Sequence, residues 1–225
     1  MDRVRHRRGT AGPAARPRAV TVLRSIDEVV ELIGRARGDA RLIVGIVGAP
    51  GSGKSTIAEQ LVERLAPEAA LLGMDGYHLP QARLVELGRR DRMGAADTFD
   101  VDAFVATLTA LRFSGGLVLA PGFDREIEEA IPDAIAIAPE KRVLVVEGNY
   151  LLHDAQGWER VAPLLDLAFF VGVDHDIRLR RLIERHERFG KTPDAAVAWA
   201  SGPDEANARL IDGTAGRADH EIRLD

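Results

Sequence analysis

Short, continuous apolar runs recur along the chain and predict strands that are buried on both faces of a sheet. The clearest runs are 42–47, 143–146 and 167–173, with a shorter one at 69–74. Weaker runs predict further short strands at 117–120, 135–138 and 221–224. Between these runs the apolar residues recur every three or four positions, which is the spacing of amphipathic helices.

Capping residues and glycines place the ends of the predicted helices. Ser25 caps the first helix, which Gly34 or Gly38 ends, and Asp100 or Asp102 caps a helix over 103–113. A helix that starts near Gly53 is expected after the loop, with Ile57, Leu61, Val62 and Leu65 on its apolar face. Further helices are expected over 84–90, 175–189 and 195–211, the last of them interrupted at Gly202–Pro203. Strands that alternate with helices predict an α/β fold, with a mainly parallel sheet and helices on both faces.

The composition narrows the class of protein. The chain has 225 residues, of which 46% are hydrophobic, and this suits one domain with a substantial core. Its net charge of −5 argues against a nucleic-acid partner, and the absence of cysteine excludes disulfides and thiolate catalysis. No apolar run approaches the ~20 residues of a membrane span, so we expect a cytoplasmic protein. We interpret 1–20, which is rich in arginine, as a flexible basic tail and 21–225 as the single domain.

One loop has the spacing of a phosphate-binding site. The segment Gly48-Ala49-Pro50-Gly51-Ser52-Gly53-Lys54-Ser55 matches G-x-x-x-x-G-K-[ST], and it lies between a buried strand and an amphipathic helix. Its glycines let successive backbone N–H groups turn toward phosphates, and the following helix adds its N-terminal dipole. Lys54 is expected to reach the β- and γ-phosphates, while Ser55 offers its hydroxyl to Mg²⁺. The sequence therefore predicts a P-loop NTPase, whose nucleotide-binding residues run from Gly48 to Thr56.

The sequence lacks the guanine-reading segment of GTPases, although this alone does not fix the preference for ATP over GTP. GTPases read guanine with an Asn-Lys-x-Asp segment, but the two asparagines here, Asn149 and Asn207, are followed by Tyr150 and Ala208. ATP is therefore the expected triphosphate.

Two carboxylates follow predicted strands, Asp75 after the run at 69–74 and Glu147 after the run at 143–146. Ligands gather at the carboxyl ends of parallel strands, so both side chains are expected beside the loop. Glu147 has the form of a Walker-B contact and is expected to bind Mg²⁺ through a water. Asp75 is the candidate to orient and deprotonate an acceptor hydroxyl. The alternative for each is a helix cap or a turn residue beside glycine.

Four more segments carry a family resemblance. They are Met74-Asp75-Gly76-Tyr77-His78-Leu79, Asp97-Thr98-Phe99-Asp100, Pro121-Gly122-Phe123-Asp124-Arg125 and Val145-Val146-Glu147-Gly148-Asn149-Tyr150-Leu151-Leu152. With the loop they resemble, in order, the motifs of the uridine kinase, phosphoribulokinase and prokaryotic-type pantothenate kinase group over about 41–219. The resemblance implies a kinase of nucleoside-monophosphate-kinase-like architecture with Asp75 as catalytic base. It also implies an acceptor site that includes Tyr77, His78, Asp97, Phe123 and Arg125.

Departures from the group's pattern leave the acceptor open. Uridine kinases usually follow the Pro-x-Tyr-Asp motif with a histidine and an arginine, whereas this chain reads Glu126-Ile127-Glu128-Glu129-Ala130. Pantothenate kinases are typically longer. Phosphoribulokinases bind a sugar phosphate, for which only Arg89, Arg90 and Arg92 stand out here. The chain is also similar to proteins described as nucleoside/nucleotide kinase family members, some of them fructose-transport-associated kinases.

A row of arginines marks the helix expected at 175–189. Residues three or four apart share a helix face, and this row contains Arg178, Arg181, Arg185 and Arg188. In this fold class such a helix begins a lid, whose arginines close over the transferred phosphoryl group. We therefore expect a small helical lid around 176–195, and the group's Arg-x-x-x-Arg spacing singles out Arg181 and Arg185. The alternative is a solvated helix laced by Glu184 pairs. Asn207 matches a position that the group also uses.

The sequence thus predicts an ATP- and Mg²⁺-dependent kinase that phosphorylates a hydroxyl of a small metabolite. Lys54, Asp75, Arg181 and Arg185 are the predicted catalytic residues, and Ser55 and Glu147 the metal contacts. The acceptor is pantothenate-, nucleoside- or sugar-like. A P-loop ATPase that regulates a protein partner is the alternative from another class, and the arginine-rich tail alone suggests a nucleic-acid-associated NTPase. No membrane contact is expected, and a homodimer is compatible with the sequence.

Overall fold

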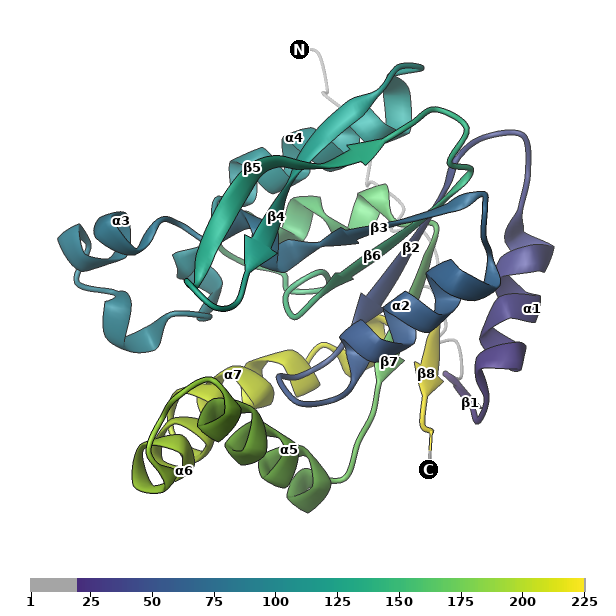
Figure 1. Cartoon of the computed structure of the whole chain (residues 1–225). Coiled ribbons are helices and arrows are strands. Elements are labelled where there is room, and N and C mark those ends of the chain that lie inside the picture. The colour runs from purple at the N-terminus through teal and green to yellow at the C-terminus, as the bar shows by residue number, and fades with distance from the viewer. Residues whose placement is uncertain (1–19, 225) are drawn as a thin grey trace, which may run out of the picture.

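The computed structural model describes residues 20–224, so the predicted basic tail lies outside the described residues apart from Val20. Six strands form one sheet in the order β1-β8-β7-β2-β6-β3, and every pair in it is parallel. Two further strands, β4 and β5, form a separate antiparallel hairpin (Figure 1). The strands are β1 Thr21–Leu23, β2 Leu42–Val47, β3 Ala69–Gly73, β4 Val118–Asp124, β5 Glu129–Ile137, β6 Val143–Gly148, β7 Leu167–Val171 and β8 His220–Ile222.

Seven α-helices accompany the strands within 20–224. They are α1 Ile26–Ala36, α2 Lys54–Arg64, α3 Gln81–Glu86, α4 Val101–Phe113, α5 His175–Arg188, α6 Pro193–Ser201 and α7 Pro203–Asp212. A short 3₁₀ turn, η1 (Met74–Tyr77), follows β3 directly. The predicted caps are confirmed at Ser25 and Asp100, whose side chains accept hydrogen bonds from the first turns of α1 and α4.

Each face of the parallel sheet packs against its own core. Along β2, Leu42, Val44 and Ile46 point to one face, where α1 and α2 cover them. Ile43 and Val47 point to the other face, where α4 and the segment 150–165 complete a second core. The continuous apolar run of β2 thus reflects a strand buried on both sides, and the predicted α/β architecture is confirmed.

Several predicted boundaries are wrong for identifiable reasons. β4 and β5 run longer than predicted, through Pro121 and Pro132, because both prolines lie where a register shift interrupts the pairing of the two strands and no N–H group is needed. The third helix begins at Gln81 rather than 84, directly after Pro80. The first helix continues through Gly34 and ends at Ala36. β1 was not predicted, since only one of its three residues is buried.

The β4–β5 hairpin docks on η1, beside the end of β3. A Cβ placed on Gly76 would lie 2.4 Å from the carbonyl oxygen of Pro121, so only glycine permits this approach. The hairpin therefore carries its tip across the carboxyl edge of the parallel sheet, close to the turn that holds Asp75.

Helices α5, α6 and α7 lie together beyond the carboxyl ends of β2 and β7 (Figure 1). Helix α5 packs directly on the glycine-rich loop: a Cβ on Gly51, which has φ +79°, would meet Leu182 Cγ at 2.8 Å. A buried ion pair joins α5 to α7, because Arg178 donates to Glu205. Arg178 is 4% exposed, so this pair fixes where α7 sits relative to α5.

Loss of this ion pair is expected to destabilise the protein. Glu205→Ala leaves the buried Arg178 charge without a partner, which should lower the free energy of unfolding by about 3 kcal/mol. The matched change Glu31→Ala, in the exposed Glu31–Arg35 pair of α1, should cost less than about 0.5 kcal/mol. Urea unfolding of both variants measures the difference, and equal small losses would show that the buried pair does not anchor α7.

Candidate active site

The glycine-rich loop connects β2 to α2. Gly53 caps α2 with a left-handed backbone, φ +89°, and Lys54 begins the helix. The hydroxyl of Ser52 is buried inside the loop without a hydrogen-bond partner. A buried polar group without a partner is costly, so the loop is built to receive one from a ligand. Backbone N–H groups at a helix start make that ligand an anion.

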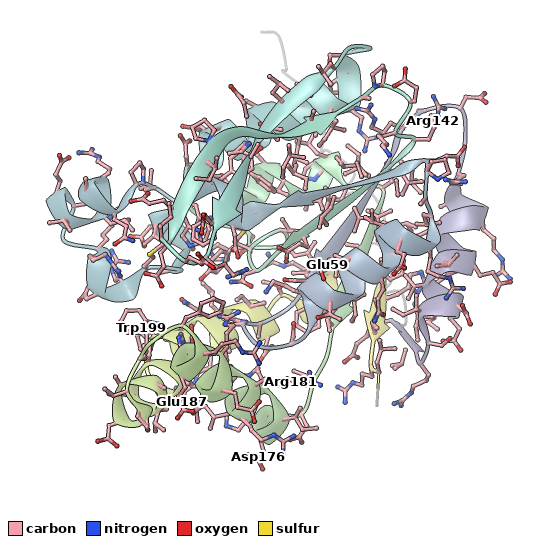
Figure 2. All side chains as sticks on the ribbon, viewed as in Figure 1. Glu59, Arg142, Asp176, Arg181, Glu187 and Trp199 are labelled. Atoms are coloured by element: carbon pink, nitrogen blue, oxygen red, sulfur yellow. The ribbon has the colours of Figure 1, made fainter. Side chains whose placement is uncertain are left out.

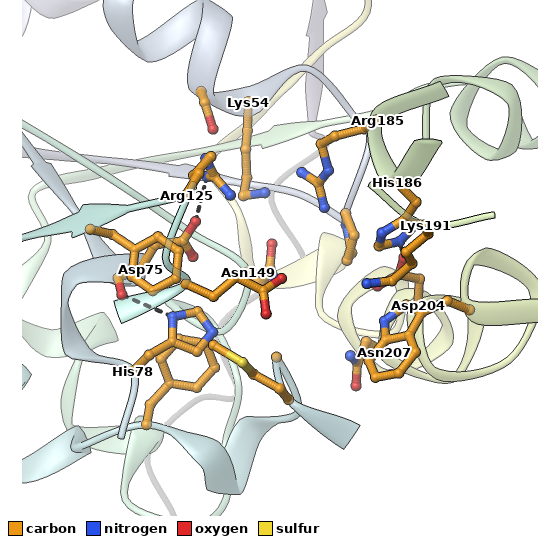
Figure 3. Close-up of a pocket in the computed structure, with 18 of the residues that line it drawn as sticks. Lys54, Asp75, His78, Arg125, Asn149, Arg185, His186, Lys191, Asp204 and Asn207 are labelled. Carbon is orange, nitrogen blue, oxygen red and sulfur yellow. Dashed lines mark hydrogen bonds and ion pairs between the residues drawn. The ribbon is translucent and has the colours of Figure 1, made fainter. Parts of the chain in front are cut away.

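Two cations converge on this loop without ion-pair partners in the described chain. Figure 3 shows the Lys54 ammonium and the Arg185 guanidinium pointing into the same space. Neither of them forms an ion pair or a side-chain hydrogen bond within residues 20–224. Burial lowers the pKa of Lys54, and repulsion from Arg185 and Arg125 adds to this effect. Burial and repulsion from Arg125 likewise lower the pKa of Arg185. Such a cluster of half-buried cations is stabilised only when an anion binds between them.

Ser55 and Glu147 supply oxygen atoms at the same place. The Ser55 hydroxyl donates to Glu147 Oε2 over 3.2 Å, at the end of β6. A hydroxyl and a carboxylate oxygen are ligands that Mg²⁺ prefers, and the residues present therefore fit this ion. Within 20–224 no group of three or more His, Cys, Asp or Glu is placed to hold a metal. The protein thus offers a partial ligand set, as expected where triphosphate oxygens complete the coordination.

Asp75 lies in η1, where it faces Lys54 across the cavity (Figure 3). Arg125, from the end of the hairpin, donates to Asp75 Oδ2 over 2.6 Å. His78 closes the other side, with its Nδ1 2.8 Å from the Asp75 backbone carbonyl and its ring between Phe99 and Phe123. Because a carbonyl only accepts, His78 Nδ1 carries the proton.

The surroundings of Asp75 keep its carboxylate ionised. Burial raises the pKa of Asp75, but the charges of His78, Arg125 and Lys54 outweigh it and hold the pKa below its ordinary value. A base must be deprotonated to act, so a lowered pKa moves the loss of activity to lower pH. The geometry thus combines an ionised carboxylate with unpaired cations in one cavity.

Removing Arg125 should move the acid limb of the pH profile. In Arg125→Ala the pKa of Asp75 rises toward or above its ordinary value, so the acid limb of kcat/KM for the acceptor should lie at higher pH than in the wild type. Parallel pH–rate profiles of the two proteins measure the displacement. A limb that stays in place, or moves to lower pH, would contradict the role of Arg125 beside the base.

Helices α5 to α7 supply the opposite wall of this cavity. His186 from α5 pairs with Asp204 of α7, with Nε2 and Oδ2 2.7 Å apart. Lys191 lies over the ring of Trp199, 4.9 Å from its centroid, and Asn207 is buried beside them. Sequence reasoning identified Arg185 and noted Asn207 as a position that the group also uses, but it did not identify His186, Asp204 or the Lys191–Trp199 contact. Adjacency to Arg185 was the one available signal for His186.

A second cavity of about 450 Å³ extends from the loop along the other side of Lys54. Its walls include Thr56, Gln60, Gly172 and Arg181. Figure 2 shows Arg181 on the side of α5 that faces α2, whereas Asp176 and Glu187 point away. A volume of this size suits the remainder of a nucleotide whose phosphates occupy the loop.

The structure does not bring all predicted site residues together. Tyr77 packs edge-on against Phe104 in the core, and Asp97 pairs with Arg92 and Arg89 at a separate surface. Neither of them lines the cavity that holds Asp75. His78, Phe123 and Arg125 do line it. Of the arginine row, Arg178 is used in the ion pair with Glu205 and Arg188 is exposed, which leaves Arg181 and Arg185 near the loop.

A phosphate-binding loop, a carboxylate and unpaired cations at the carboxyl edge of a parallel sheet are the features of P-loop kinases, ATP-dependent enzymes that phosphorylate hydroxyl groups. The chain belongs to the phosphoribulokinase / uridine kinase family, whose profile matches residues 43–220. The resemblance expected from its motifs is thereby confirmed. No helix within 20–224 is long and apolar enough to cross a membrane.

Individual relatives carry several names. A putative uridine kinase of Schizosaccharomyces pombe is 33% identical over 201 residues, which cover 83% of each chain. An ATP-dependent kinase-like protein of Aspergillus versicolor is 41% identical over 133 residues, 56% of this chain and 77% of that one. The crystal structure of a putative fructose transport system kinase from Silicibacter sp. TM1040 is 36% identical, with a TM-score of 0.82, and covers 89% of this chain and 99% of that one.

Proposed function

We propose that the chain transfers the γ-phosphoryl group of ATP to a hydroxyl group of a small metabolite bound between the β4–β5 hairpin and helices α5 to α7. The observation that carries this proposal is the juxtaposition, in one cavity, of an ionised Asp75 with the unpaired cations Lys54 and Arg185. A hydrolase that activates water has no need of such an acceptor cavity lined from both sides.

The bond changes follow from this placement. The acceptor's hydroxyl oxygen forms a bond to the γ-phosphorus, and the bond from that phosphorus to the β–γ bridging oxygen breaks, so ADP leaves with the electron pair. Asp75 orients the hydroxyl and accepts its proton. Lys54 and Arg185 face the charge that develops on the phosphoryl oxygens, and Arg181 lies toward the nucleotide side. When bound at Ser55 and Glu147, Mg²⁺ neutralises charge on the β- and γ-phosphates.

Helices α5 to α7 act as a lid in this proposal, and their arginines complete the site. In the described structure the Arg125 guanidinium donates a hydrogen bond to the Asp75 carboxylate. The acceptor hydroxyl must therefore displace Arg125 or bind the other oxygen of this carboxylate. ATP rather than GTP as donor, and the cytoplasm as compartment, are part of the proposal on the grounds of the sequence alone. A homodimer stays a prediction.

The direct experiment measures ADP release from ATP and Mg²⁺ in the presence of single acceptors. A panel of sugars, polyols, nucleosides and pantothenate covers the three acceptor classes that the sequence leaves open. We expect at least one compound to stimulate ADP release well above basal hydrolysis. If every compound leaves the rate at its basal value, the regulatory ATPase becomes the better account.

A further inference from the structure

The acceptor cavity holds hydrogen-bonding groups that the proposed chemistry does not use. The side-chain Oδ1 of Asn149, just after β6, is buried and has no hydrogen-bond partner. Across the cavity, the Asp204 carboxylate is hydrogen-bonded to His186 through Oδ2, which leaves Oδ1 without a partner within residues 20–224. The side-chain amide of Asn207 makes no hydrogen bond within the same residues. Figure 3 shows Asn149 on one side and Asp204 and Asn207 on the other.

We infer that Asn149, Asp204 and Asn207 form a recognition subsite for a small, uncharged polyhydroxylated acceptor of monosaccharide size. The inference rests on the proposed kinase function and deepens it. Unused oxygen atoms on Asn149 and Asp204 require donors, and Asn207 offers both a donor and an acceptor. A hydroxyl group is both donor and acceptor, so neighbouring hydroxyls of one molecule satisfy all three side chains.

Ion pairs and ring contacts account for part of the positive charge that lines the cavity. Arg90 is paired with Glu128 and Arg125 with Asp75, while Lys191 lies over the Trp199 ring. Lys54 and Arg185 face the phosphate-binding loop. The three side chains of the subsite add two oxygens that would repel a carboxylate or phosphate group of the acceptor. An uncharged acceptor avoids this repulsion and the cost of burying its own charge.

The cavity beside the three side chains suits an acceptor smaller than a nucleoside. The enclosed cavity measures about 130 Å³. Pockets that enclose drug-sized ligands are larger, roughly 300–1,000 Å³. A further opening of about 410 Å³ lies under the hairpin, on the other side of Asp75. Apart from residues shared with the active site, its walls are Leu71, Pro121, Ile135 and glycines, which offer no polar side chain to a sugar.

The test compares acceptors and variants by steady-state kinetics of ADP release. D-fructose, D-glucose, D-ribose and erythritol are measured against uridine and pantothenate. We expect a sugar or polyol to have the highest kcat/KM. If uridine or pantothenate is preferred, the kinase proposal stands and the subsite inference is overturned. If no compound stimulates ADP release, both are overturned.

Substitutions in the subsite test which side chains bind the acceptor. Asn207→Ala and Asn149→Ala should each raise the acceptor's KM about 5- to 100-fold, as loss of a buried hydrogen bond implies, and should affect KM more than kcat. Leu210→Ala, a change of an exposed side chain on α7, should leave both constants unchanged. Deoxy analogues of the preferred acceptor provide the sharper test: one of them should bind the wild type and the Asn207 variant equally. If none of these substitutions changes the KM for the acceptor, the subsite is refuted. Circular dichroism checks that each variant is folded.

Discussion

Asp75→Asn should reduce acceptor-dependent ADP release by about 10²- to 10⁴-fold, because the amide cannot accept the proton of the hydroxyl. The change keeps the size of the side chain, so the cavity is preserved. Stopped assays with saturating ATP and acceptor measure kcat directly. Since Asp75 lies beside the loop rather than within it, titration calorimetry with a non-hydrolysable ATP analogue should still detect nucleotide binding.

The control for this prediction is Asp91→Asn, an exposed aspartate in the loop after α3. This control should retain wild-type activity, since it alters the same functional group away from the cavity. Under the regulatory ATPase alternative, Asp75→Asn would instead hydrolyse ATP at the wild-type rate. That outcome would remove Asp75 from the chemistry and leave the acceptor cavity without a function.

The second large effect is expected at Arg185. Arg185→Ala removes a cation that faces the transferred phosphoryl group and has no ion-pair partner within the described residues. Removal of one such donor costs about 10²- to 10³-fold in kcat, or about 2.7–4 kcal/mol of transition-state stabilisation. The KM for ATP should change less than kcat, because the charge on the phosphoryl oxygens is greatest in the transition state.

Arg188→Ala is the matched control, since Arg188 is an exposed arginine on the same helix, one turn further from the loop. It should leave kcat within about twofold of the wild type, as exposed surface changes usually do. Equal losses at the two positions would indicate that the charge of α5 as a whole matters, rather than the guanidinium that enters the cavity.

The sheet and the loop were predictable because their signals are local. The run at 42–47 and the loop at Gly48–Ser55 are set by consecutive residues, and the structure has them as predicted. The positions of Asp75 and Glu147 beside the loop were predictable because both residues come directly after apolar runs, and ligands bind at the carboxyl ends of parallel strands. The structure places both beside Lys54.

The wall formed by α5 to α7 was not predictable in the same way. Asp204 and Asn207 face the cavity because α7 packs beside α5, and the buried pair of Arg178 with Glu205 links these two helices. Helical spacing placed Arg178 on the same face as Arg185, but spacing carries no information on which carboxylate from another helix will bury it. Likewise, the strand predicted over 117–120 continues past Pro121 to Asp124.

The central claim is transfer of phosphate to an organic hydroxyl, and the fate of the γ-phosphorus tests it most directly. The full chain is incubated with Mg²⁺ and [γ-³²P]ATP and with the sugar, polyol, nucleoside and pantothenate acceptors, and the products are separated chromatographically. The account predicts a labelled organic phosphate that forms in equal amount with ADP and disappears in Asp75→Asn. Label found only in inorganic phosphate, with every acceptor, would contradict it.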